Sequence, residues 1–226
     1  MSNIISEHFK FPKLFTCGAS GSGKDTICNY LIDEGYLRLR LAHTIKQIIC
    51  EKRNLSFDEL EVIKRTVAEI RTEHNDLGDF MNETNGTLNR IDLLERFEAL
   101  DFEYLKQIGW DFKNQPKVYV DVRNYEEANK LFSYGYYGIF LTRQTNEFKN
   151  PKHHTEQNMF FNGDLERLIA EQKNNMSIIC NNNHILENTD TFDTLVLEKY
   201  DSITDVIMCD GTAGDLLEQV KHKFII

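Results

Sequence analysis

KLFTCGASGSGK, residues 13 to 24, is the stretch that decides the fold of this chain. The mostly apolar run 13–17 predicts a short buried strand. Residues 25–33 predict a helix, because apolar side chains recur there on one helical face. Residues 18–24 lie between the two and fit the pattern G-x-x-x-x-G-K. The strand before this pattern and the helix after it favour a phosphate-binding loop over a plain Gly/Ser turn.

Such a loop works by wrapping its backbone around an anion. Its glycines let successive N–H groups turn towards a phosphate, and the N-terminus of the following helix adds positive potential. Lys24 would reach the β- and γ-phosphates of a nucleoside triphosphate and offset charge during phosphoryl transfer. We therefore expect an ATP site formed by consecutive residues: Gly18, Ala19, Ser20, Gly21, Ser22, Gly23, Lys24, Asp25 and Thr26.

The residue after the lysine departs from the pattern. A Ser or Thr is expected there to hold Mg²⁺, but this chain has Asp25 followed by Thr26. Asp25 would either contact Mg²⁺, directly or through water, or only favour the helix N-terminus electrostatically. Thr26 is the other candidate for the hydroxyl ligand, and the sequence leaves these alternatives open.

Strand and helix patterns alternate along the rest of the chain. The expected strands are 36–41, 118–122, 138–142, 177–180 and 205–209, and the expected helices are 126–134, 165–172 and 213–224, besides a mainly helical segment at about 44–113 that breaks near 82–86. This alternation predicts a three-layer α/β fold of the P-loop kinase type, with a five-stranded parallel core sheet and helices on both faces. We expect a single domain over residues 1–226, in which the polar segment at about 144–204 forms a lid and an insertion.

Parallel sheets bind ligands outside the carboxyl ends of their strands. Asp121 ends an apolar run there, at a position where a carboxylate would order water around Mg²⁺. Arg123 comes two residues later and suits bidentate phosphate contact. Arg143 ends the next strand. Three residues after the last strand complete the set: Asp210, Gly211 and Thr212.

Composition limits the classes of partner. The 226 residues are 41% hydrophobic and 27% charged, as in ordinary globular domains. With 26 basic and 36 acidic residues the net charge is −10, which argues against a constitutive duplex-DNA binder but not against a local basic pocket. No apolar run approaches the roughly 20 residues that span a bilayer, and the N-terminal stretch lacks a signal-peptide pattern. We expect a cytoplasmic protein without membrane contact, with reduced cysteines and no zinc.

Further short segments follow the phosphate-loop pattern in order: 41–46 (LAHTIK), 77–79 (LGD) with Arg71 upstream, 121–128 (DVRNYEEA), 138–143 (GIFLTR), 154–156 (HTE) and 205–216 (DVIMCDGTAGDL). With the Asp-Thr ending of the loop, this series resembles the phage-type deoxynucleoside monophosphate kinases over most of the chain. The shared order makes the matches jointly specific.

The resemblance implies a role for each matching residue. Residues 18–26 and 210–212 would hold ATP. The metal, Mg²⁺, would lie near Asp25, Thr26 and Asp121. The acceptor nucleotide would be bound by Lys46, Arg71, Asp121 and Arg123. The catalytic residues would be Lys24, Arg123 and Arg143, the last of them carried by a lid that includes His154 and Glu156.

The expected reaction transfers the γ-phosphoryl group of ATP to a (deoxy)nucleoside 5′-monophosphate, in the host cytoplasm if the chain is of phage origin. Two alternatives stay open: a kinase of another small phosphorylated acceptor, and a nucleotide-binding module that has lost activity and acts through a protein partner. Cys209 stands where the family has Asn, and residues 157–204 are longer than the family needs. That segment would alter specificity or form an interface, for example in a homodimer.

Overall fold

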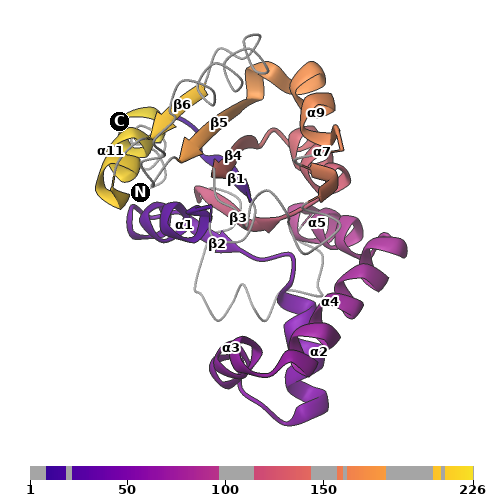
Figure 1. Ribbon diagram of the computed structural model, residues 1–226. Helices are drawn as coiled ribbons and strands as arrows, with labels where there is room; N and C mark the ends of the chain where they lie inside the picture. Colours follow the sequence, from indigo (N-terminus) through magenta and orange to yellow (C-terminus); the bar gives the residue numbers. More distant parts are fainter. Residues whose placement is uncertain are drawn as a thin grey trace. The chain divides into compact units, whose positions relative to one another are not determined.

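The computed structural model of this protein describes residues 9–18, 22–96, 115–143, 157–159, 162–181, 206–209 and 212–225. They belong to two compact units (Figure 1). The first unit holds the described residues up to Leu39 and those from 115 onward, and the second begins at Arg40. The described part of the second unit, up to residue 96, is helical, as predicted for the segment at about 44–113.

A parallel sheet forms the centre of the first unit. Its strands are β1 (Lys13–Gly18), β2 (Leu37–Leu39), β3 (Lys117–Val122), β4 (Tyr137–Arg143), β5 (Met176–Asn181) and β6 (Val206–Cys209). Their order in the sheet is β2-β3-β1-β4-β5-β6, and each neighbouring pair is parallel. The α/β class is confirmed, and the described sheet has six strands, one more than the five predicted.

Helices cover both faces of this sheet, as predicted. Helix α1 (Lys24–Asp33) packs with α11 (Ala213–Phe224) on one face, and α7 (Tyr125–Ser133) packs with α9 (Asp164–Gln172) on the other (Figure 1). The α1 side buries Ile27 and Leu31 against β-strand residues such as Leu14. The strands read as near-continuous apolar runs because both of their faces are covered.

Part of the segment interpreted as a lid and insertion belongs to this sheet. Residues 164–181 form α9, the short 3₁₀ helix η2 (Lys173–Asn175) and β5, and β5 pairs with β4 on one side and β6 on the other. The insertion interpretation is therefore confined to the rest of the segment. Residues 144–156 and 182–205, which carry most of it, lie outside the described residues.

Local sequence signals set several helix ends. In the second unit, Ser56 begins α3 (Phe57–Thr66): its Oγ accepts from the Glu59 N–H (3.3 Å), and the Glu59 carboxylate accepts from the Ser56 N–H (2.8 Å). The sequence Ser56-Phe57-Asp58-Glu59 fits the capping-box pattern that predicts a helix start, and the structure confirms it. Gly35 and Gly135 follow α1 and α7 with φ of +106° and +77°, a region that favours glycine.

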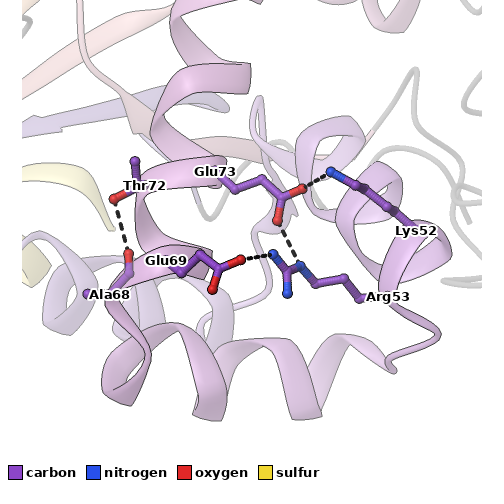
Figure 2. A network of polar contacts seen from close by, with 6 residues as sticks. All are labelled: Lys52, Arg53, Ala68, Glu69, Thr72 and Glu73. Carbon is purple, nitrogen blue, oxygen red and sulfur yellow. Dashed lines mark hydrogen bonds and ion pairs between the residues drawn. The ribbon is translucent and has the colours of Figure 1, made fainter.

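The second unit consists, within its described residues, of α2 (His43–Arg53), α3, α4 (Ala68–Glu83) and α5 (Gly86–Arg96). Apolar residues of α2, α3 and α4 form its core: Ile45, Ile49, Cys50, Leu60 and Ile70. An ionic network ties α2 to α4 (Figure 2). In it, the Glu73 carboxylate accepts from Lys52 Nζ (2.5 Å) and Arg53 Nε (2.8 Å), and Arg53 Nη2 donates to Glu69 (3.1 Å).

Within the described part of the chain, no helix is long and apolar enough to cross a membrane.

A glycine in β4 leaves room for three aromatic rings on the α7 face. A Cβ on Gly138 would lie 2.7 Å from Phe140 Cε2, 2.8 Å from Phe15 Cζ and 3.1 Å from Phe132 Cζ. The rings pack edge to face, with centroids 5.1 Å apart for Phe15–Phe132 and 5.6 Å apart for Phe15–Phe140.

We predict that Gly138→Ala lowers the free energy of unfolding by about 1–3 kcal/mol, because the methyl group overpacks this cluster. The measurement is the denaturant midpoint and slope. The matched control is Gly214→Ala in α11, where a Cβ would meet only Thr212 Oγ1 at 3.4 Å. It is expected to be neutral or slightly stabilising. Equal effects of the two substitutions would contradict the prediction.

Candidate functional site

The carboxyl ends of β1 and β3 form the candidate site. The two strands are neighbours, and Cys17 pairs with Val122 near their ends. β1 leads into α1 on one face of the sheet, whereas β3 leads into α7 on the opposite face (Figure 1). Ligands of open parallel sheets bind where neighbouring strands diverge in this way.

The turn from β1 to α1 is tight at both of its described ends. A Cβ on Gly18 would lie 2.5 Å from Ser22 Oγ and 3.0 Å from the Leu141 carbonyl oxygen, so no larger residue fits there without a shift. Gly23 has φ +95° and ψ 2°, which favours glycine. Ser22 is 1% exposed, and its hydroxyl has no hydrogen-bond partner among the described residues. The predicted Ala19, Ser20 and Gly21 lie outside the described residues.

Helix α1 begins without a side-chain cap within the described part of the chain. Its N-cap is Gly23, whereas Ser56 and Asn124 cap α3 and α7 with side-chain oxygens. The first N–H groups of a helix need acceptors. At α1 no described side chain caps these groups, so they can donate to a ligand, and their dipoles favour an anion.

Lys24 is the first residue of α1, and its side chain is 13% exposed. Its Nζ lies 3.8 Å from Asp25 Oδ1, while the Asp25 side chain is 88% exposed. A carboxylate that is this exposed and this far from the ammonium group contributes little, so Asp25 does not neutralise the lysine strongly. Thr26 is half-buried in the same turn.

Asp121 lies at an irregularity of β3. Phe15 pairs with Tyr119 and Cys17 with Val122, so that Thr16 alone faces two residues, Val120 and Asp121. Such bulges re-aim side chains and are frequent beside active sites. Asp121 is half-buried, while its neighbours in β3 are buried.

Glu127 is a residue whose role the sequence reasoning missed. It is 5% exposed, and its Oε2 accepts a hydrogen bond from the Arg123 N–H (2.8 Å). The Asn124 side chain in turn accepts from the Glu127 N–H (2.8 Å). Glu127 therefore holds the turn between β3 and α7 that carries Asp121 and Arg123. An Asn followed three residues later by Glu is the helix-start signal that would have found it.

The other predicted residues are placed as follows. Arg123 is exposed just after β3, and Arg143 ends β4 opposite Asn181 of β5. Thr212 precedes α11 and donates from both its N–H (2.6 Å) and its hydroxyl (3.0 Å) to the Asp215 carboxylate. Asp210, Gly211, His154 and Glu156 lie outside the described residues.

Two predicted acceptor residues belong to the second unit. Lys46, in α2, is 9% exposed and forms an ion pair with Glu61 of α3. Arg71 is exposed on α4. The first unit thus brings together Gly18, residues 22–26, Asp121 and Arg123.

These residues fit a nucleoside triphosphate with Mg²⁺. The Ser22 hydroxyl, which has no partner among the described residues, and the start of α1, which no described side chain caps, supply donors for phosphate. No group of three or more His, Cys, Asp or Glu gathers to hold a metal within the described residues. A phosphate-bound Mg²⁺ needs only one or two carboxylates besides phosphate oxygens and water, and Asp121 fits that role.

Comparison of the sequence with models of protein families and with curated proteins found no match.

Burial gives Glu127 an unusual acidity. Loss of hydration, helped by the nearby Asp121 charge, raises its pKa to about 7 from 4.5, against the opposing effect of the N–H donors of Arg123 and Asn124. Between these two values the folded protein binds more protons than the unfolded chain. Stability therefore falls as the pH rises through this window.

We predict that the free energy of unfolding of the wild type falls by up to about 3 kcal/mol more than that of Glu127→Gln between pH 4.5 and 7. Chemical denaturation at a series of pH values measures this difference. Glu126→Gln, at the exposed neighbouring position, is the control and should keep the wild-type slope. If Glu127→Gln also keeps that slope, Glu127 does not titrate in this range.

Proposed function

We propose that this protein transfers the γ-phosphoryl group of ATP to a (deoxy)nucleoside 5′-monophosphate. The observation that carries the proposal is the β1–α1 turn: Gly18 packed against Ser22, Gly23 in the left-handed region, and Lys24 opening an uncapped helix beside Asp121. The resemblance to phage-type deoxynucleoside monophosphate kinases, and with it a role in deoxynucleotide metabolism in the cytoplasm, is part of the proposal.

The β1–α1 turn would bind the donor triphosphate. Backbone N–H groups at the start of α1 and the buried Ser22 hydroxyl donate to phosphate oxygens. Lys24 offsets the negative charge that builds up during transfer. Because its partner Asp25 is 88% exposed and 3.8 Å away, Lys24 turns to a phosphate at little cost.

Asp121 would order the metal at the neighbouring strand end, with Asp25 and Thr26 as further candidates. A Mg²⁺ ion held there would supply positive charge that offsets part of the charge on the triphosphate. Glu127 keeps the turn after Asp121 in place through the Arg123 N–H. Arg123 is thereby held at the same edge of the sheet, where it contacts phosphate.

The chemistry would need no covalent intermediate on the protein. Its residues align donor and acceptor and stabilise the transferred group, which is the larger part of phosphoryl-transfer catalysis. Lys46 and Arg71 are the proposed acceptor residues, and Arg143 with the segment after it is the proposed lid. Excluding water matters because water competes as the phosphoryl acceptor.

The test is to incubate the protein with Mg²⁺-ATP and each ribo- and deoxynucleoside monophosphate, and to follow ADP and the diphosphate product. Product with at least one acceptor supports the proposal. ATP binding without product on any nucleotide overturns it, and a second panel of other small phosphorylated acceptors then separates another kinase from an inactive nucleotide-binding module.

We predict that Lys24→Ala lowers turnover by about 100-fold or more while the fold remains intact, because a charge that stabilises the transition state is lost. Turnover and the thermal midpoint are measured together. Lys221→Ala, at an exposed position of α11 in the same unit, is the control and should leave turnover unchanged. A Lys24→Ala enzyme within about threefold of the wild type would contradict the assignment of the loop.

The two carboxylates are expected to differ in their effect on the metal. We predict that Asp121→Asn raises the Mg²⁺ concentration for half-maximal rate by on the order of tenfold, as loss of a metal-ordering group does. Asp25→Asn should have a smaller effect, because its side chain is 88% exposed. Rates across a Mg²⁺ series at saturating ATP measure both. A larger effect of Asp25→Asn would reverse the assignment.

A further inference from the structure

Helices α2 and α3 of the second unit meet through two matched pairs of side chains. The rings of His43 and Phe57 are stacked, with centroids 5.0 Å apart and planes 8° apart. Lys46, one turn after His43, forms an ion pair with Glu61, one turn after Phe57. Residues three or four apart lie on the same helix face. A stacked aromatic pair and an ion pair therefore lie one helical turn apart, and each pair has one member from each helix.

The aromatic pair offers a surface for stacking. Phe57 is 37% exposed and His43 is half-buried, so the stacked pair is not enclosed by the protein. Nucleobases stack on such rings regardless of their hydrogen-bonding edges, because each base has a π-face.

In the Lys46–Glu61 ion pair, Lys46 can exchange its partner Glu61 for another anion. Lys46 is 9% exposed, while the Glu61 side chain is 39% exposed. Burial acts to raise the pKa of Glu61, but the hydrogen bond from Lys46 and the positive charges of Lys46, Lys64 and Arg40 outweigh it and lower the pKa. Glu61 thus has two further cations nearby. It can release Lys46 to another anion without becoming an isolated charge, whose cost would otherwise be high.

We propose that His43, Phe57, Lys46 and Glu61 form a mononucleotide-binding site on the α2–α3 pair, in which the base stacks on the aromatic rings and the 5′-phosphate replaces Glu61 as the partner of Lys46. This inference rests on the proposed function in identifying the ligand as the acceptor nucleotide. It adds the base-binding residues, and it gives Glu61 the role of a counter-ion that occupies the site until the phosphate arrives.

Displacement of Glu61 by the 5′-phosphate predicts that substitutions of Lys46 and of Glu61 change the affinity for the mononucleotide in opposite directions. Lys46→Gln weakens binding of the mononucleotide by about tenfold or more, because the cation is lost. Glu61→Gln tightens it several-fold, because Lys46 then has no competing carboxylate. A purely structural ion pair predicts that both substitutions act in the same direction, through loss of stability. Lys52→Gln is the matched control, since Lys52 of the same helix pairs with Glu73 in the network of Figure 2.

Stacking is tested separately. Phe57→Leu should weaken mononucleotide binding by about fivefold or more and leave the binding of inorganic phosphate unchanged. Phe80→Leu, at a position of α4 that is 60% exposed, is the control and should change neither.

Isothermal titration calorimetry on the full chain without ATP measures these effects. The probes are the four deoxynucleoside 5′-monophosphates, each compared with its nucleoside and with inorganic phosphate, and thermal unfolding checks that every variant is folded. Absence of mononucleotide binding, or weaker binding in both Lys46→Gln and Glu61→Gln, overturns the inference.

The transfer assay separates this outcome from that of the proposed function. Phosphoryl transfer without the opposite-sign pattern leaves the kinase proposal in place and removes the α2–α3 site. The pattern without phosphoryl transfer establishes the site and removes the kinase proposal.

Discussion

A Cβ at residue 18 would lie 2.5 Å from the Ser22 hydroxyl and 3.0 Å from a carbonyl oxygen of β4. This close approach at the end of the central strand is the constraint on which the site depends. It brings Ser22, one residue before the N-cap Gly23, against the end of β1. Lys24 and the first N–H groups of α1 come directly after this contact in the chain.

At the end of the neighbouring strand β3, a different constraint applies: the free-energy cost of burying a carboxylate. Glu127 fastens the β3–α7 turn through the Arg123 N–H, but it does so beside Asp121 and away from water. A second ionised carboxylate would oppose the charge on Asp121. The raised pKa of Glu127 reduces this repulsion near neutral pH, because part of the population is protonated. Glu127 thus holds the β3–α7 turn with less repulsion of Asp121, the carboxylate that would hold Mg²⁺ under the proposed function.

Local signals account for the parts that the sequence predicted well. The alternation of strands and helices, the glycines after α1 and α7, and the Ser56–Glu59 box each depend on residues close together in the chain, and each is found in the structure. The bulge at Asp121 and the Lys46–Glu61 pair depend on which distant segments become neighbours. No spacing rule in the sequence encodes which distant segments become neighbours, so these two features could not be predicted from the sequence. All six strands were expected as segments of the sequence, and only their number in one sheet was predicted too low, at five.

Lys24 and Lys46 differ in how strongly they are paired with their counter-ions. Under the proposed function, this difference decides which anion can bind each lysine. Lys24 faces an exposed carboxylate 3.8 Å away, a pairing worth little, so a triphosphate wrapped by backbone N–H groups captures it readily. Lys46 is buried to a similar degree, but its partner Glu61 is in direct contact with it and only 39% exposed. An anion must therefore bring further binding free energy to displace Glu61. A base stacked on His43 and Phe57 would supply it, whereas inorganic phosphate has nothing to stack. The ion pair would then act as a filter that admits a phosphate attached to a nucleoside in preference to a free one.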